Sequence, residues 1–313
     1  MTISLLIPVC DYDIVAMVHS MKRCLPDIPE FIEILIGDDG SSPSWTDKYR
    51  SLNGPGVRII RSEKNIGRAA IRNLLALEAK GDHLLFIDAD TMIPGTPEAF
   101  IRNWIDAAGI ARVIFGGVLY HETPPGDPDK ILRWKNGRRR EQKKAAIRNK
   151  HPYASFSTFN VLIEKNIFEK LRFNEEIRQY GHEDTLFSYQ LKKAGIDIGH
   201  IDNGLIHEGL ESNRDYLNKT KLRIENLSKL YDFITDKKTF ASTVRMIRLY
   251  RILSLLKLNL ILAGFFIRFR EKMELKIDSA NPRLILFSVY KVTMFCTFRE
   301  IHRRKKTVPT FVL

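Results

Sequence analysis

Short apolar runs alternate with helix-like segments along the first ninety residues, and this alternation constrains the fold more than any other feature. Runs rich in Ile, Leu and Val, each bounded by turn residues, are typical of buried parallel strands. The segment 66–80 has helical composition and stops at Gly81, as helices often do. Strands alternating with helices predict an α/β fold with a mostly parallel sheet flanked by helices. The expected strands are 3–9, 32–37, 57–60 and 83–87, followed by 113–120, 157–163 and 196–201.

Two of these expected strands are followed by pairs of aspartates, at the edge of a parallel sheet where ligands bind. Asp38 and Asp39 follow the strand 32–37 and precede Gly40. Their carboxylates can accept hydrogen bonds from a nucleobase N–H or from ribose hydroxyl groups. An Asp-Gly pair also closes tight turns in many proteins. This pair alone therefore supports a nucleotide contact and a structural turn equally well.

The second pair, Asp88 and Asp90, follows the strand 83–87 with one residue between the acids. Two such carboxylates can converge on one hard cation only where the chain bends, and residues 91–94 permit a bend. A divalent cation bound by carboxylates and phosphates would offset the charge on a departing diphosphate. His207 is a candidate third metal ligand, although a lone histidine is more often structural. The alternative for the acidic pair is a solvated loop.

Basic side chains lie at the start of the helix expected over residues 66–80. Arg68 and Arg72 are four residues apart and share one helix face, just after Asn65. A phosphate near this N-terminus would meet the helix dipole and a guanidinium group together. The pattern therefore predicts a phosphate contact, with a surface ion-pair face as the alternative for Arg72.

A third acidic pair, Glu183 and Asp184, opens a helix expected over residues 184–194. A carboxylate in this first turn can take the proton from an attacking hydroxyl group, as a general base does. The alternative is structural, because helix N-termini favour acidic residues. His182 and the loop of aromatic and glycine residues before the acids favour the catalytic interpretation.

The formal net charge of +13 is concentrated at the C-terminal end of the chain. Residues 241–313 contain fifteen Lys and Arg against four Asp and Glu, so the preceding part is nearly neutral. A nearly neutral body argues against a nucleic-acid-binding surface. The three cysteines have no paired spacing, which is typical of reduced thiols in a cytosolic protein without structural zinc.

Two apolar stretches of this tail, 247–269 and 284–298, are interrupted by Arg and Lys. The longest uncharged run, 258–267, is too short to cross a bilayer of about 30 Å, which needs about 20 residues. Such helices fit the interface of an anionic membrane. The alternative is that they cover the body or a partner chain. The composition predicts a folded domain at residues 1–238 and a basic amphipathic helical tail at 239–313.

In this order, these segments resemble the family 2 glycosyltransferases, which have the GT-A fold with a Rossmann-like sheet. The resemblance covers roughly residues 1–230, and its specificity comes from the combination rather than from any one motif. The segment Gly181-His182-Glu183-Asp184 looks like the Gly-x-Glu-Asp motif of bacterial members that build surface polysaccharides. The other matching segments are Ile7-Pro8-Val9, Asp38-Asp39-Gly40-Ser41, Asn65-Ile66-Gly67-Arg68 with Arg72-Asn73, and Ile87-Asp88-Ala89-Asp90.

The resemblance implies a metal-dependent hexosyltransferase that moves one sugar from a nucleotide sugar with inversion at the anomeric carbon. It implies Asp184 as the base, with Glu183 beside it, and a divalent cation, Mn²⁺ or Mg²⁺, as the cofactor. The nucleotide would contact Pro8, Asp38, Asp39, Asn65, Arg68, Arg72 and Asp88; the metal would contact Asp88, Asp90 and His207; and the acceptor would contact Asn160 and His182.

The expected partners are a nucleotide sugar, with UDP as the favoured nucleotide, a glycan or lipid-linked acceptor, and an anionic membrane surface through the tail. The expected location is cytoplasmic, at the inner face of the plasma membrane. The chain contains no Gln-x-x-Arg-Trp sequence, which favours addition of single sugars over polymerisation. A glycine-rich phosphate loop or a Gly-x-Gly-x-x-Gly motif after the first strand is also absent, against a nucleotidyltransferase or a nicotinamide enzyme. The remaining alternative is a membrane-docked, non-catalytic scaffold with the same fold.

Overall fold

The computed structural model describes residues 1–176 and 181–305, with side chains up to residue 302. The chain forms two compact units, each assembled from separate stretches of sequence. The first comprises residues 1–120, 142–178 and 186–209, and the second comprises residues 121–141, 179–185 and 210–313.

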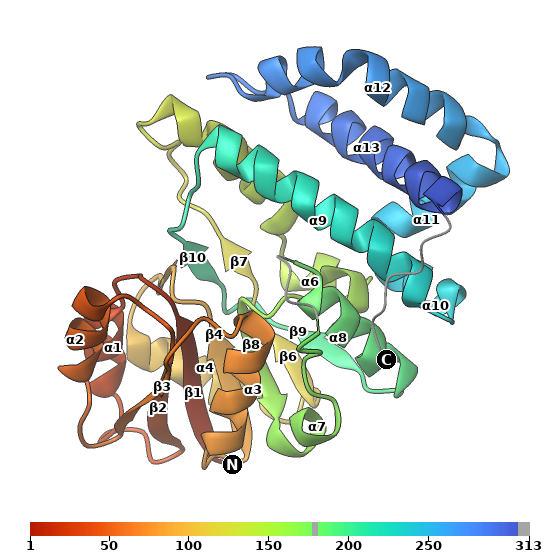
Figure 1. Cartoon of the computed structure of the whole chain (residues 1–313). Helices are drawn as coiled ribbons and strands as arrows, with labels where there is room; N and C mark the ends of the chain where they lie inside the picture. The colour runs from red at the N-terminus through yellow and green to blue at the C-terminus, as the bar shows by residue number, and fades with distance from the viewer. Residues whose placement is uncertain (177–180, 306–313) are drawn as a thin grey trace. The chain divides into compact units, whose positions relative to one another are not determined.

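The first unit is built on a sheet in which the strands run in the order β3-β2-β1-β4-β8-β6-β9 among the described residues (Figure 1). Neighbouring strands are parallel except at β8, which runs antiparallel to both β4 and β6. This arrangement confirms the predicted α/β fold with a mostly parallel sheet. The strands are β1 (Ile3–Val9), β2 (Phe31–Asp39), β3 (Val57–Ser62), β4 (His83–Ile87), β6 (Val113–Phe115), β8 (Asn160–Glu164) and β9 (Ile198–His200).

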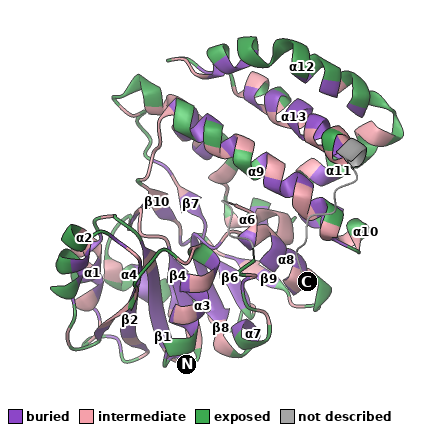
Figure 2. Cartoon of the chain, in the orientation of Figure 1, coloured by how far each residue is buried: buried purple, intermediate pink, exposed green. Residues whose placement is uncertain are grey.

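Helices flank this sheet, and the central strands are buried (Figure 2). One close approach depends on Gly37 of β2: a Cβ at this position would come 2.9 Å from both Ile71 and Leu75 of α3. The glycine therefore lets α3 pack directly on the strand that ends in Asp38 and Asp39. The helices of this unit include α1 (Val15–Lys22), α2 (Pro43–Arg50), α3 (Arg68–Glu78), α4 (Pro97–Ala107), α6 (Ala145–Arg148) and α7 (Lys165–Lys170), and α8 (Glu183–Lys193) runs from the second unit into the first.

A small second sheet has the order β5-β10-β7 among the described strands: β5 (Thr91–Met92), β10 (Leu205–His207) and β7 (Val118–Leu119). The single strand predicted over 113–120 is therefore wrong, because β6 and β7 belong to different sheets. The chain changes sheet at Gly116 and Gly117. Gly117 has φ +106°, and a Cβ at Gly116 would come 2.5 Å from Asn160 Nδ2. This glycine pair marks a break that the apolar pattern alone does not reveal.

The described part of the second unit is helical. Its long helices α9 and α13 pack together, and α12 lies alongside α13 (Figure 1). Arg299 of α13 is buried 5.0 Å from the ring of Tyr231 on α9, and it pairs with Asp232 at 2.7 Å. The domain boundary predicted between residues 238 and 239 stays a prediction. The helices are α5 (Ile131–Asn136), a π-helix (Gly137–Glu141), α9 (Asn213–Phe233), α10 (Lys237–Thr243), α11 (Arg245–Leu255), α12 (Leu258–Ile277) and α13 (Leu284–Lys305).

Candidate active site

Asp90 lies in the short link between β4 and β5, where the main sheet meets the small sheet. β5 pairs antiparallel with β10, and this register places His207 opposite Thr91. As a result, the Asp90 Oδ2 atom lies 3.5 Å from His207 Nε2. The backbone adds a further link, because Glu208 N donates to Asp90 O at 2.9 Å. Two residues 117 positions apart in sequence are therefore brought together by the pairing of two short strands.

Aromatic rings hold the His207 imidazole in place from two directions. The Tyr120 ring stacks on it with centroids 5.7 Å apart, and the Phe159 ring stacks on it at 5.5 Å. Gly209 closes the other side of the Asp90 carboxylate: a Cβ at this glycine would clash with Oδ2 and would lie 3.0 Å from Asp90 Cβ and Cγ. The Asp90 carboxylate therefore lies directly against the backbone of Gly209, where a side chain would not fit.

The electrostatics around Asp90 favour a positive partner. Burial raises the pKa of Asp90, and the nearby Asp88 raises it further, whereas His207 and Arg68 lower it. A carboxylate that is costly to keep charged gains most from a cation bound directly to it. The site therefore presents a partly buried oxygen donor and an imidazole nitrogen within reach of one ion.

These residues fit a divalent cation. Hard divalent ions often take only one or two protein carboxylates, with substrate phosphates and water completing the shell. In the part of the chain that the structure describes, no group of three or more His, Cys, Asp and Glu side chains converges to form a metal centre. Asp90 and His207 would hold the ion, and diphosphate oxygens would supply further ligands.

Asp88 has a partner within the protein, and its predicted contacts with the nucleotide and the metal stay predictions. Its Oδ1 accepts a hydrogen bond from Arg72 Nη2 at 2.6 Å, and the Arg72 side chain is only 2% exposed. Arg72 therefore sits beneath the site on α3 and is not part of a surface ion-pair face. The pair fixes Asp88 at the end of β4, and Thr91 Oγ1 donates to the Asp88 carbonyl at 2.9 Å.

Asp38 and Asp39 both stabilise the loops that follow their strand. Asp38 is fully buried and accepts from Ser41 N at 2.9 Å and from Thr46 Oγ1 at 3.2 Å. Asp39 accepts from the backbone N–H groups of Ile66 at 2.6 Å and Gly67 at 3.1 Å. Burial raises the pKa of Asp39, and these two backbone hydrogen bonds oppose that rise. Within the structure, the two aspartates act as the turn-forming residues that the Asp-Gly pattern also allowed.

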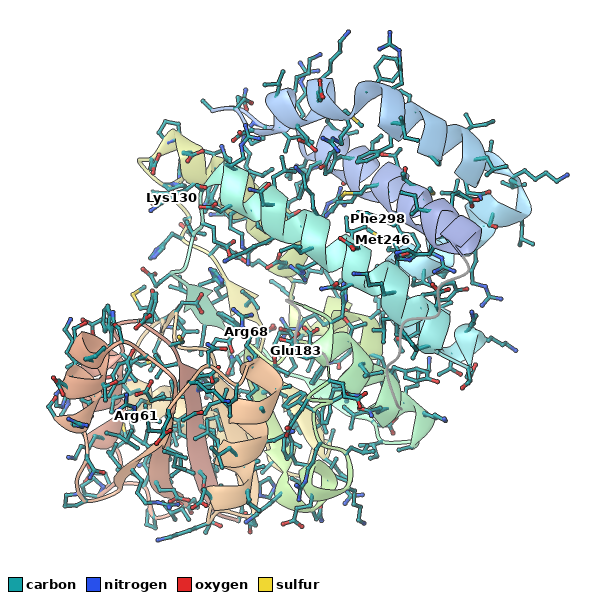
Figure 3. All side chains as sticks on the ribbon, viewed as in Figure 1. Arg61, Arg68, Lys130, Glu183, Met246 and Phe298 are labelled. Carbon is teal, nitrogen blue, oxygen red and sulfur yellow. The ribbon has the colours of Figure 1, made fainter. Side chains whose placement is uncertain are left out.

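The loop between β3 and α3 holds the remaining predicted nucleotide residues. Asn65 Nδ2 donates to the Asp39 carbonyl at 3.2 Å, which ties this loop to the end of β2. Arg68 is the first residue of α3 (Figure 3) and follows Gly67, which has φ +94° and open space around a Cβ position. Pro8 is half-buried near the end of β1 and pairs in register with Gly37.

The Asn160 side chain connects separate segments of the first unit by hydrogen bonds. It is completely buried, and its Nδ2 donates to the Asn203 carbonyl at 2.7 Å and to the Gly117 carbonyl at 3.3 Å. Its predicted contact with an acceptor stays a prediction.

His182 anchors the loop before α8. Its Nε2 lies 2.8 Å from the carbonyl of Arg223 on α9, so this nitrogen carries the proton and donates. Its Nδ1 accepts from Thr185 Oγ1 at 3.1 Å. Burial lowers the pKa of His182 to about 4, so the ring is neutral near pH 7. Both ring nitrogens are engaged within the second unit, and the residue has φ +82°, after Gly181 at φ +93°.

Glu183 and Asp184 begin α8, as predicted from the sequence. Glu183 is buried, and Asp184 is half-buried and accepts from Thr185 N at 2.7 Å through Oδ1. Tyr180, which belongs to the same motif, lies outside the described residues. The anchored loop fixes the position of the first turn of α8. It therefore fixes the backbone from which the side chains of Glu183 and Asp184 extend.

Sequence reasoning did not find Gly209, Tyr120, Phe159 or Arg61. Arg61 Nε lies 3.6 Å from the buried Asp38 carboxylate. The roles of the other three depend on the pairing of β10 with β5 and β7, and strands of two or three residues leave no periodic signal. The only available signal was the position of Gly209 directly after His207-Glu208.

Comparison with known sequences decides the family. The family model described as Glycosyl transferase family 2 matches residues 4–172, which is more than half of the chain. The chain belongs to glycosyl transferase family 2. A search of curated proteins finds no match to this transferase.

Solved structures similar to this family 2 transferase show the same GT-A fold. A mannosyltransferase from Pyrobaculum calidifontis, in complex with GDP-Man and Mn²⁺, is 10% identical over 97% of this chain and 87% of its own, with TM-score 0.54. Mannosyl-3-phosphoglycerate synthase from Rubrobacter xylanophilus is 15% identical over 74% of each chain, with TM-score 0.52. GalNAc-T7 with UDP, GalNAc and Mn²⁺ is 18% identical over 75% of this chain and 48% of its own, with TM-score 0.52. At these identities the likeness concerns the fold.

Proposed function

We propose that this protein is an inverting glycosyltransferase that moves a single sugar from a nucleotide sugar to a hydroxyl group of a glycan or lipid-linked acceptor. Membership of glycosyl transferase family 2 supports glycosyl transfer. The observation that carries the metal-assisted form of the proposal is the Asp90 carboxylate, 3.5 Å from His207 and closed on one side by Gly209. This arrangement suits a divalent cation, Mn²⁺ or Mg²⁺, that shares its coordination with a diphosphate.

Each residue has a defined role in this proposal. Asp184 takes the proton of the acceptor hydroxyl as its oxygen bonds to the anomeric carbon. The bond from that carbon to the diphosphate breaks on the opposite face, and the diphosphate leaves with the electron pair, which inverts the configuration. Arg68 at the start of α3 contributes positive charge to the leaving diphosphate. A cation held by Asp90 and His207 would supply further Lewis-acid stabilisation of the same charge.

Neighbouring residues support these roles indirectly. Arg72 holds Asp88 through a 2.6 Å hydrogen bond, and we assign to Asp88 the acceptance of a hydrogen bond from a ribose hydroxyl. Asp39 and Asn65 shape the loop against which the nucleobase would rest. We propose UDP as the nucleotide and synthesis of cell-surface polysaccharide as the process, since the Gly-His-Glu-Asp segment resembles that of bacterial enzymes of this type. The solved complexes with GDP-Man and with UDP come from other proteins, and they support the nucleotide-sugar class only through the shared fold.

Nucleotide binding tests the cation site without requiring the acceptor. Calorimetric titration of UDP, GDP, CDP and dTDP should find one that binds with Mn²⁺ and loses at least about tenfold in affinity without it. Asp90→Ala should remove this dependence on Mn²⁺ while leaving the thermal transition intact. Asp106→Ala, an exposed aspartate on α4, is the matched control and should bind as the wild type does. Binding that is unaffected by Asp90→Ala would exclude the cation site at Asp90, and failure of all four nucleotides to bind would refute the proposed function.

A further inference from the structure

The second apolar stretch of the tail, residues 284–298, packs one face into the core of the second unit. Phe287, Tyr290, Phe295 and Cys296 of α13 are each no more than 1% exposed. Their packing partners lie in the same unit: the Phe287 ring is 5.7 Å from Tyr216 of α9. The structural interpretation therefore applies to this buried face of α13, whereas Ile285 on the same helix is 78% exposed.

The first apolar stretch behaves differently. It forms α11 and α12, which meet at Lys257, a residue in the left-handed conformation with φ +56°. The direction of the chain bends by 110° between the two helices. We call residues 249–269 of this bent pair the apolar elbow.

Large apolar side chains of the elbow are exposed to an unusual extent. The Leu255 side chain is 85% exposed and Ile261 is 68% exposed. On the opposite face of the same helices, Tyr250 and Phe266 are buried against the rings of Phe295 and Tyr290 of α13. One face therefore packs on the rest of the second unit, and the other face is exposed, as the colouring of α12 shows (Figure 2). The exposed apolar residues are Leu249, Ile252, Leu255, Leu256, Leu258, Leu260, Ile261, Phe265, Ile267 and Phe269.

The charged residues of the elbow and of the segment before it have a single sign, and the nearby Glu300 of α13 accepts a hydrogen bond from Asn259 Nδ2 of α12 at 2.7 Å. Residues 237–270 contain eight Lys and Arg and no Asp or Glu. Six of the basic side chains are exposed on α11, on α12 or at the bend between them: Arg245, Arg248, Arg251, Lys257, Arg268 and Arg270. Pairing with a second copy through a two-fold interface would bring this cationic face against itself, which is unfavourable. An anionic surface complements it.

The length of the apolar run limits how deeply the elbow can enter a membrane. Among the described residues, no single helix is long and apolar enough to span a membrane, and only the bent pair α11–α12 reaches that composition together. The uncharged run 258–267 rises by about 15 Å as a helix, half of the ~30 Å hydrocarbon core. Beyond it, Arg268 and Arg270 return the helix to polar surroundings. The length of this run therefore matches one leaflet of a bilayer.

We infer that the apolar elbow docks the protein on an anionic phospholipid bilayer, with Leu255, Leu256 and Ile261 in the acyl boundary and the surrounding arginines at the lipid phosphates. Apolar burial and charge attraction add together in such interfacial binding. This inference goes beyond the proposed function and does not depend on it, because it concerns where the chain resides. For a transferase with a lipid-linked acceptor, it would place the protein at the inner face of the plasma membrane.

Vesicle co-sedimentation of the full chain tests the inference. The wild type should bind vesicles of phosphatidylcholine with 30% phosphatidylglycerol at least about tenfold more tightly than vesicles of phosphatidylcholine alone. The double variant Leu255→Asp/Ile261→Asp should lose at least about tenfold of this binding. Ile110→Asp changes an apolar side chain outside the elbow that is 63% exposed, close to the 68% of Ile261, and should bind as the wild type does.

A second double variant tests the contribution of charge separately from that of the apolar side chains. Arg248→Glu/Arg268→Glu leaves the apolar groups in place and removes two cationic side chains. At about fivefold per basic residue near an anionic surface, it should weaken binding by at least about 25-fold, and thermal unfolding should stay unchanged. Undiminished binding of either double variant would overturn the inference. So would equal wild-type binding to both vesicle types, or a dimer in solution that Leu255→Asp dissociates, since the elbow would then be a protein interface.

Discussion

A methyl group added at Gly209 should disable the cation site without disturbing the fold. The Cβ of Gly209→Ala would clash with Asp90 Oδ2 and lie 3.0 Å from Asp90 Cβ and Cγ. Because apolar and polar heavy atoms rest roughly 3.5 Å apart, the carboxylate must move by about 1 Å. Gly209 does not have a left-handed φ angle, so alanine can adopt its backbone conformation.

The size of this displacement gives the expected loss in catalytic rate. A displacement of about 1 Å in a reacting constellation costs about 100-fold in rate, or about 2.7 kcal/mol of transition-state stabilisation. We therefore expect Gly209→Ala to lower kcat/KM by about 100-fold and to weaken Mn²⁺-dependent nucleotide binding. The free energy of unfolding should change by no more than about 1 kcal/mol.

Calorimetry with nucleotide and Mn²⁺, together with denaturant unfolding, separates the two effects. Gly126→Ala is the matched control, because a Cβ at Gly126 meets nothing within 4 Å. It should match the wild type in both measurements. Unchanged Mn²⁺-dependent nucleotide affinity in Gly209→Ala would show that the Asp90 carboxylate is not where the cation binds.

Three further substitutions test the packing around the site and the tail. Burial lowers the pKa of Lys291 to about 8, so between pH 8 and 10.5 folding releases its proton. The free energy of unfolding of the wild type should therefore rise by about 3 kcal/mol between pH 8 and 10.5. Lys291→Met should lack this rise in urea titrations. The pKa of His182 is about 4 in the folded protein and about 6.5 in the unfolded chain, so the free energy of unfolding of the wild type should fall by about 3 kcal/mol between pH 7 and pH 4. An equally steep loss in His182→Ala would contradict the burial of His182 as a neutral ring. Arg72→Met should destabilise the fold by about 3 kcal/mol, because it leaves Asp88 without its 2.6 Å partner; a change below about 0.5 kcal/mol would refute the structural role of the pair.

The sequence predicted the sheet well, because the central strands are buried on both faces. The runs 3–9, 32–37, 57–60 and 83–87 all form strands that overlap β1 to β4, and the helix 184–194 agrees with α8 to within one residue. Continuous apolar runs between turn residues are a strong local signal. The pairs of acidic residues were found for the same reason, since they directly follow or precede those elements.

The contacts made by the site residues could not be read in the same way. Asp88 pairs with Arg72 only because α3 packs beside the end of β4, and Asp90 approaches His207 only because β10 arrives from a distant part of the chain. Alternation of apolar residues carries no information about such partners. The buried face of α13 was hidden for a related reason: its apolar residues look the same whether they meet lipid or the rings of Tyr216 and Tyr250.

Release of nucleotide from a panel of UDP-, GDP-, CMP- and dTDP-sugars in the presence of Mn²⁺ tests sugar transfer most directly. We predict that the wild type releases the nucleotide from one donor, slowly with water and faster with a glycan or lipid-linked acceptor. Asp184→Asn should bind the same donor with similar affinity and lose at least about 100-fold of the acceptor-stimulated rate. A wild-type protein that neither binds nor turns over any of these donors would contradict the account and leave a non-catalytic scaffold with the transferase fold.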